Sequence, residues 1–113
     1  MPHLNYLSHH RKRWALSQRE LALLVGHASR SVVSRLELGG GRPSLQFAIR
    51  CEAVFGVSVT ELFPDLHQEN HDLVMRRAAR LDLRLRERSD AAAARKRQLL
   101  SEMINRAPQR DPA

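Results

Sequence analysis

Four side chains on one short stretch of the chain carry groups that can form hydrogen bonds or apolar contacts with the edges of nucleic-acid bases. They are the outward positions of a helix predicted to begin near Ser29, namely Arg30, Ser31, Val32 and Arg35. An arginine can donate two parallel hydrogen bonds to guanine O6 and N7, a serine hydroxyl can bond to several bases, and a valine methyl can contact thymine. Arg30 and Ser31 fall in the first turn, the part that meets base edges when a helix enters the major groove of DNA. The alternative is that these side chains only face solvent.

Two short helices joined by a tight turn are predicted to position these side chains. Ser17 and Glu20 form a capping-box pattern, so a helix should begin at Gln18. Gly26 should end that helix because glycine adopts the left-handed conformation without strain, and Ser29 should cap the next. The inward apolar residues of the pair are predicted to be Leu21, Ala22, Leu24, Val25, Val33 and Leu36. So short a link makes the helices cross steeply and leaves the outer face of the second one free.

Four blocks of sequence, in this order, resemble the lambda-repressor/Cro-like (XRE-type) helix-turn-helix family. The blocks are L-S-Q-R-E-L-A-x-L-x-G, S-R-S-V-V-S-R-L-E, R-P-S-L and F-G-V-S-V-x-E-L-F, all within residues 6–63. The resemblance implies base contacts by Arg30, Ser31, Val32 and Arg35. The segment from residue 26 to residue 37 is one residue longer than the usual family spacing, and we place the extra residue at 27–28.

The resemblance also implies contacts that hold the domain on the DNA backbone. Gln18 matches the family's usual phosphate anchor, which stands at a helix N-terminus with free N–H groups. The other phosphate contacts that we expect are Ser29, Arg42, Ser44 and Arg13. For Arg13, and for Lys12 beside it, the alternative is a basic face in solvent. In the family, an arginine at the place of Arg11 pairs with the glutamate ending the second motif helix, so we expect an ion pair with Glu37.

The charge of the chain favours a polyanionic partner. Its 113 residues carry a formal net charge of +7, with a pI near 11.2. Such a surplus suits nucleic acid or an acidic protein surface. All 19 basic residues except Lys12 and Lys96 are arginine, which suits bidentate contacts, although the base composition of a genome gives the same bias.

Several other classes of protein are not supported by the sequence. The single Cys51 cannot form an internal disulfide and suits the cytoplasm, where we expect it as a buried small side chain. We expect no membrane-spanning helix, because no stretch approaches about 18 apolar residues. His67 and His71 have one metal-ligand spacing but no accompanying cysteine, so we expect a surface pair and no metal. The chain has no nucleophile elbow or phosphate-binding loop, and we expect neither enzyme activity nor a cofactor.

Three further helices complete a predicted five-helix domain over residues 1–65. The first should span Leu4 to Trp14, with both of these residues and Leu7 facing inward. After a glycine loop at 39–41, the next should begin at a Ser44 cap. Its predicted buried residues are Leu45, Ala48, Ile49 and Phe55. The last short helix is predicted between a capping box, Ser58 with Glu61, and Pro64. Glu52 is an unexpected charge in this apolar region unless an arginine meets it.

Residues 66–113 form a tail rich in arginine and alanine, predicted as one or two helices with a frayed end. Apolar residues at helical spacing are Val74, Ala78, Leu81 and Leu85, then Leu99, Leu100, Met103 and Ile104. Ser89–Asp90 should cap the second segment. The run L-D-L-R-L-R also alternates with period two, so a short strand is the alternative; the flanking residues favour helix.

Together these patterns predict an all-α, sequence-specific regulator of transcription that binds double-stranded DNA, a repressor that dimerises through its tail. The alternative is an antitoxin or anti-activator whose tail binds a protein partner while its helix-turn-helix domain regulates its own operon. The tail could instead only pack on the domain. RNA binding through residues 76–97 is disfavoured, because that segment lacks aromatic side chains on which bases stack.

Overall fold

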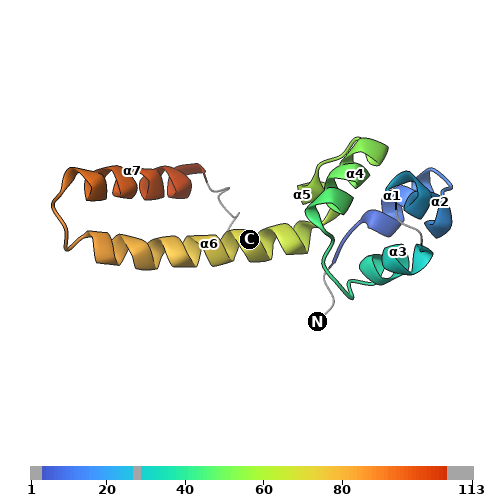
Figure 1. The fold of residues 1–113 in the computed structure, drawn as a ribbon, viewed down its shortest axis with the longest axis horizontal. Coiled ribbons are helices and arrows are strands. Elements are labelled where there is room, and N and C mark those ends of the chain that lie inside the picture. Colours follow the sequence, from blue (N-terminus) through green and yellow to red (C-terminus); the bar gives the residue numbers. More distant parts are fainter. Residues whose placement is uncertain (1–3, 27–28, 107–113) are drawn as a thin grey trace, which may run out of the picture. The chain divides into compact units, whose positions relative to one another are not determined.

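The computed structural model describes residues 4–26 and 29–106, and this part of the chain is helical, without strands (Figure 1). Its helices are α1 (Leu7–Arg13), α2 (Gln18–Leu24), α3 (Arg30–Glu37), α4 (Leu45–Phe55), α5 (Val59–Leu62), α6 (Pro64–Leu85) and α7 (Ala91–Arg106). The predicted all-α fold is therefore confirmed. Two compact units form, Met1–Glu69 and Asn70–Ala113, and α6 contributes to both. The extra turn residue placed at 27–28 and the end predicted to fray lie outside the described residues.

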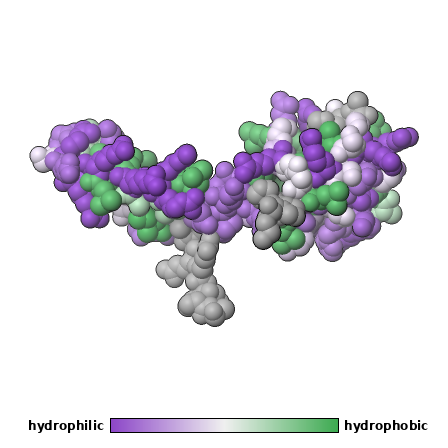
Figure 2. All heavy atoms as spheres, turned by 90° about the horizontal axis from the view of Figure 1, so that it is seen from below, coloured by the Kyte–Doolittle hydropathy of each residue, from purple (hydrophilic) through white to green (hydrophobic). Residues whose placement is uncertain are grey.

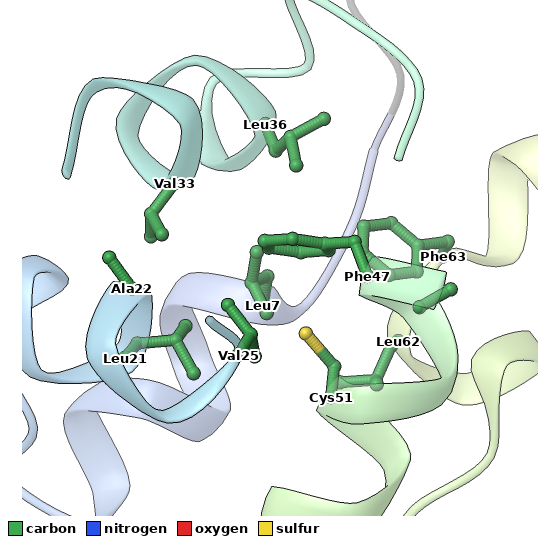
Figure 3. Packing of buried hydrophobic residues seen from close by; sticks show 11 residues of the cluster. Leu7, Leu21, Ala22, Val25, Val33, Leu36, Phe47, Cys51, Leu62 and Phe63 are labelled. Carbon is green, nitrogen blue, oxygen red and sulfur yellow. The ribbon is translucent and has the colours of Figure 1, made fainter. Parts of the chain in front are cut away.

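The core of the first unit is built from one face of each of its helices. Its buried members are Leu7, Leu21, Ala22, Val25, Val33, Leu36, Phe47, Ala48, Cys51, Leu62 and Phe63 (Figure 3). Phe47 is the largest fully buried side chain. Cys51 is buried, as predicted, and burial raises the pKa of its thiol to about 12, so the thiol stays protonated and unreactive near neutral pH.

The predicted start and inward face of the first helix are wrong. Helix α1 begins at Leu7, and both Leu4 and Trp14 are exposed. The chain before α1 is bound to other elements instead: the Leu4 N–H donates to Asp65 Oδ2 at 2.8 Å, and the Asn5 side chain donates to the Leu36 carbonyl at 2.7 Å. These bonds hold the segment outside the helix, and Trp14 lies beyond the last helical residue.

Three leucine or isoleucine side chains predicted to be buried are also exposed, namely Leu24, Leu45 and Ile49. In α4 the inward stripe includes Phe47, Ala48 and Cys51, so the helix is rotated from the predicted face. The large ring of Phe47 sets that rotation, because burying it removes more apolar surface from water than burying Leu45 or Ile49.

The predicted caps are present and explain where the helices begin and end. Ser17 and Glu20 form the reciprocal capping box, whose hydrogen bonds lower the pKa of Glu20. Ser29, Ser44 and Ser58 each accept an N–H at the start of α3, α4 and α5. Gly26 and Gly56 have φ of 79° and 69°, the left-handed region that glycine occupies without strain.

Glu52 has a partner that differs from the arginine considered above. Its Oε1 accepts the N–H of Val59 at 2.7 Å. The carboxylate thus satisfies a backbone donor at the start of α5, a group that would otherwise lack a partner within the helix. Pro64 does not merely end α5: it is the first residue of α6, a position where the missing N–H of proline costs nothing.

The second unit is a helical hairpin of the remainder of α6 and α7 (Figure 1). Its buried residues are Ala78, Leu85, Ala93 and Leu100, with Met103 packed against them. Helix α6 runs to Leu85, so the alternative of a short strand at L-D-L-R-L-R is excluded. The predicted cap before α7 is Asp90, whose Oδ2 accepts the Ala93 N–H at 3.3 Å. Residue 65, the predicted end of the first domain, lies inside α6.

Candidate nucleic-acid interface

A buried polar network fixes α3 against α1 and α2. Arg11 Nε lies 2.6 Å from Glu37 Oε2, and Arg11 Nη2 donates to Glu37 Oε1 at 3.1 Å. The two side chains are only 11% and 6% exposed. Gln18 Nε2 donates to the same Oε1 at 2.9 Å, and Arg11 Nη1 donates to the Leu16 carbonyl at 2.8 Å. The hydrogen bond to Glu37 raises the pKa of Arg11, so the guanidinium group stays charged at all physiological pH values.

The first turn of α3 presents its polar side chains outward. Arg30 and Ser31 are exposed. Ser29 Oγ accepts the Ser31 N–H at 3.1 Å and lies 2.6 Å from the Ser31 hydroxyl. The two hydroxyls therefore orient each other, which limits the rotamers that Ser31 can offer to a ligand.

The apolar side of α3 attaches the helix to the core. Val33 and Leu36 are buried, and Val32 is half-buried and packs against the same core. The prediction that Val32 faces outward is wrong in this respect. Its position next to Val33 on the helix brings it to the edge of the inward stripe, because neighbouring residues lie about 100° apart around the axis.

Arg35 is positioned by the glycine loop that follows α3. The Gly40 N–H donates to the Arg35 carbonyl at 3.0 Å. A Cβ added at Gly41 would lie 3.2 Å from Arg35 Nε, and one at Gly40 would lie 3.3 Å from Arg35 Cγ. The absence of side chains at both positions leaves room for the arginine to run along the loop. The sequence indicated the glycine loop but not its close approach to the Arg35 side chain.

An open depression of about 480 Å³ brings the outward residues of α3 together with the start of α2. Its lining is Gln18, Arg30, Ser31, Ser34, Arg35 and Leu38. Ser34 and Leu38 were missed by the sequence analysis, although helical spacing places Ser34 four residues from Arg30 and Leu38 three from Arg35. Leu38 is 75% exposed, so the depression carries an apolar group beside two guanidinium groups.

The remaining predicted phosphate contacts do not line this depression. Arg42 Nη2 pairs with Glu69 Oε1 at 2.9 Å, with both side chains exposed. Ser44 Oγ accepts the Phe47 N–H at 3.1 Å as the cap of α4. Arg13 is exposed, and its guanidinium carbon lies 5.6 Å from the centre of the Trp14 ring.

Arg50 is a positioning residue that the sequence analysis missed. Its Nη1 donates to the Val25 carbonyl at 3.0 Å, and a Cβ at Gly26 would lie 3.3 Å from that nitrogen. The side chain of α4 therefore satisfies a carbonyl at the end of α2, where the chain turns toward α3. A separation of 25 residues hides such a contact from any local sequence pattern.

Across residues 4–26 and 29–106, no helix is long and apolar enough to cross a membrane. The described residues contain no group of three or more His, Cys, Asp or Glu side chains that could hold a metal ion.

Comparison with known proteins agrees with this geometry. The helix-turn-helix family model matches residues 11–62, a span that begins in α1 and ends with α5. No curated protein and no solved structure was found to match the chain. The matched span contains the Arg11–Glu37 pair, both helices of the motif and the lining of the depression. Residues 11–62 therefore form a DNA-binding domain of the lambda-repressor/Cro-like (XRE-type) helix-turn-helix family of transcription regulators.

Proposed function

We propose that the protein is a sequence-specific repressor that inserts α3 into the major groove of double-stranded DNA. The observation that carries this proposal is the depression on the outer face of α3, whose lining consists of two arginines, two serines, an exposed leucine and Gln18. This combination supplies bidentate donors for guanine, hydroxyls for several bases and an apolar contact for thymine. Bound at a promoter, such a protein blocks transcription in the cytoplasm.

Arg30, Ser31 and Arg35 read base edges in this proposal. Arg30 and Ser31 stand in the first turn of α3, which reaches deepest when a helix of this motif docks. The glycine loop leaves room for the Arg35 side chain to lie along it, because a Cβ at Gly40 or Gly41 would crowd that side chain. Because Val32 packs against the core, it offers only part of its surface to a thymine methyl, and Leu38 is the larger apolar contact.

Phosphate contacts flank α3 and fix its register on the DNA. Gln18 stands at the start of α2, and the phosphate binds there with the help of the free backbone N–H groups of the helix. Ser29, Arg42, Ser44 and Arg13 complete the set, and Arg42 exchanges its partner Glu69 for a phosphate. If a dimer neutralises about eight phosphates, the logarithm of affinity falls against the logarithm of salt concentration with a slope near −7.

The antitoxin or anti-activator alternative rests on the tail. The hydrophobic side chains that α6 and α7 expose favour a macromolecular partner of some kind. A heterologous partner and a second copy of the chain make opposite predictions for the oligomeric state of the isolated protein, so one measurement separates them.

The test of base readout is Arg30→Ala, with Arg13→Ala as the matched control. An operator is first selected from a random duplex library with the wild-type protein. Affinity is then measured for that operator and for a scrambled duplex of equal length at one salt concentration. Loss of one bidentate contact should reduce the operator-to-scrambled affinity ratio by about 5- to 150-fold. Arg13→Ala should weaken both complexes equally, because a phosphate contact carries no sequence information.

Circular dichroism should show both variants folded, since both side chains are exposed. Equal losses on the two duplexes for Arg30→Ala would make Arg30 a phosphate contact. An unchanged affinity for both would remove α3 from the DNA interface.

A further inference from the structure

The second unit carries a groove between its two helices. The groove has a volume of about 490 Å³, within the range of about 300–1,000 Å³ that is usual for small-molecule sites. Its lining is mostly apolar, with Met75, Ala78, Ala79, Leu83, Leu100 and Ile104, but it also includes Asp82, Arg86, Arg97 and Ser101. This lining defines the hairpin groove, and all of it belongs to the second unit.

The hairpin groove leaves large apolar side chains in contact with water. Leu83 and Ile104 are each 62% exposed, and on the face drawn in Figure 2 hydrophobic side chains lie among hydrophilic ones over α6 and α7. Covering such side chains is favourable in proportion to the apolar area removed from water. The other large hydrophobic residues that the hairpin exposes, Val74, Leu81 and Leu99, do not line the groove. The groove is therefore distinct from the rest of the apolar surface of the hairpin.

The charged residues of the hairpin groove all lie at one of its ends. The two helices of the hairpin are antiparallel (Figure 1), and the bond between Arg97 and Asp82 fixes their register. From this pair, the direction toward the start of α6 is also the direction toward the end of α7, where Met75 and Ile104 line the groove. Arg86 lies one turn from Asp82 in the opposite direction. The hairpin groove is thus charged near the loop between the helices and without charged lining residues at the other end.

Asp82 holds two guanidinium groups at the charged end. Its Oδ2 accepts from Arg86 Nε at 3.0 Å, and its Oδ1 accepts from Arg97 Nε at 3.1 Å. Both bonds use Nε, and among the described residues the Nη groups of Arg86 and Arg97 have no hydrogen-bond partner. One carboxylate against two guanidinium groups leaves a charge of about +1 at this end, by the ordinary charges of these groups. The charged end therefore offers N–H donors and attracts an anion.

The charge and its position decide between classes of occupant. A helix of a protein partner lays an apolar stripe along several turns of a groove, and acidic residues on its flanks would need positive residues along the whole length. The hairpin groove offers positive lining residues at one end only, which fits a molecule with a single anionic group at the end of an apolar chain. A carboxylate matches the surplus of one charge and forms charge-assisted bonds with guanidinium, whereas a phosphate monoester carries about −1.5 to −2.

We propose that the hairpin groove binds an aliphatic monocarboxylate, a free anion with a hydrocarbon chain. Its carboxylate lies between Arg86 and Arg97, and its chain runs past Ala79 toward Met75 and Ile104. The flexible thioether side chain of methionine adapts to chains of different shape. This proposal goes beyond DNA binding and does not depend on it, because every residue that it uses lies in the second unit.

The experiment is isothermal titration calorimetry of the full chain without DNA, with decanoate as the probe at concentrations below micelle formation. Decyltrimethylammonium has the same hydrocarbon chain with a cationic head and is the matched control. Decanoate should bind more tightly than this cation by about 10-fold or more, because only the anion gains charge-assisted hydrogen bonds. Affinity should also rise from hexanoate to decanoate by about 2- to 4-fold for each added methylene, because each one covers more of the apolar groove.

The variant that tests the charged end is Arg97→Gln, which should weaken decanoate binding by about 10-fold. Its control is Arg95→Gln, because Arg95 is an exposed arginine of the same helix that does not line the groove. The control loses the same charge and should bind decanoate as the wild type does. Circular dichroism accompanies each variant, and if Arg97→Gln loses helicity, Arg86→Gln carries the test with the same expected loss.

Several results would overturn the proposal. Decanoate that does not bind at millimolar concentration would show that the groove takes no such ligand. Equal affinity for decanoate and decyltrimethylammonium, or equal losses for Arg97→Gln and Arg95→Gln, would remove the carboxylate from the two arginines. An amphipathic helical peptide with leucine on one face and glutamate on both flanks is the last probe. If this peptide binds and decanoate does not, the occupant is a protein helix.

Discussion

The two units of this chain differ in how completely each buries its own apolar side chains. In the first, Phe47, Leu21 and Leu62 are fully buried together (Figure 3). In the second, alanines supply half of the buried residues, and Leu83 and Ile104 face water. The first unit therefore has a core of large buried side chains, whereas the second leaves its largest apolar side chains partly exposed to water. The two units therefore depend on different interactions for stability.

The ion pairs of the two units also differ in burial, and those of the first unit are more buried. Arg11 and Glu37 are buried and tie α1 to α3, so the loss of either leaves an uncompensated charge in the protein interior. The hairpin has exposed pairs such as Arg88 with Asp90, 2.7 Å apart. Exposed pairs contribute little to stability because water and salt screen them. Substitutions should therefore have large effects in the first unit and small ones in the hairpin.

The largest effect should follow from Phe47→Ala. Removing a fully buried ring leaves a cavity and should lower the free energy of unfolding of the first unit by about 3–5 kcal/mol. Urea unfolding followed by circular dichroism measures this change. The matched variant Leu85→Ala, in the buried cluster of the hairpin, should leave the main transition in place. A single transition that moves equally for both variants would show that the units do not unfold separately.

A smaller effect is expected from Arg11→Met. Glu37 would keep the hydrogen bond from Gln18 but lose its ion pair, at a cost of about 3 kcal/mol for the remaining buried carboxylate. The double variant Arg11→Met with Glu37→Leu should recover most of this loss in urea unfolding, because no charge is left buried. A double variant less stable than the single one would show that the pair itself stabilises the fold.

The smallest effect concerns pH and the hairpin. Hydrogen bonds from Arg88, and to a lesser extent the Ala93 N–H, hold the pKa of Asp90 at about 2, below its ordinary 3.8. A lowered pKa stabilises the folded state above the ordinary value, and that stabilisation disappears as pH falls from about 4 to about 2. The hairpin's thermal stability, followed by circular dichroism, should fall over this range.

Asp90→Asn is the control for this titration, because its amide oxygen can still cap α7 but its side chain does not titrate. Its stability should change less with pH over the same range. A profile identical to that of the wild type would assign the acid sensitivity to other carboxylates, among them Asp82, whose pKa is lowered mainly by its hydrogen bond with Arg97.

Local patterns were sufficient for most of the helix caps. Ser17 with Glu20, the serine caps of α3 to α5, and Gly26 stand where the sequence placed them. These features depend on residues within a few positions of one another. The predicted faces of α1 and α4 were less accurate, because several rotations of a helix give an apolar stripe, and contacts with other elements choose among them.

The candidate site also has features that the sequence predicted and features that only the structure revealed. The sequence by itself determined a basic, all-helical chain and the outward positions of Arg30, Ser31 and Arg35 on α3, because helical spacing fixes which residues share a face. Only the tertiary structure brought Gln18 and Leu38 to the same depression, ran Arg35 along a glycine loop and placed Arg50 at the end of α2. The physical reason is range: hydrogen bonds and packing between segments far apart in the chain leave no periodic trace in the sequence.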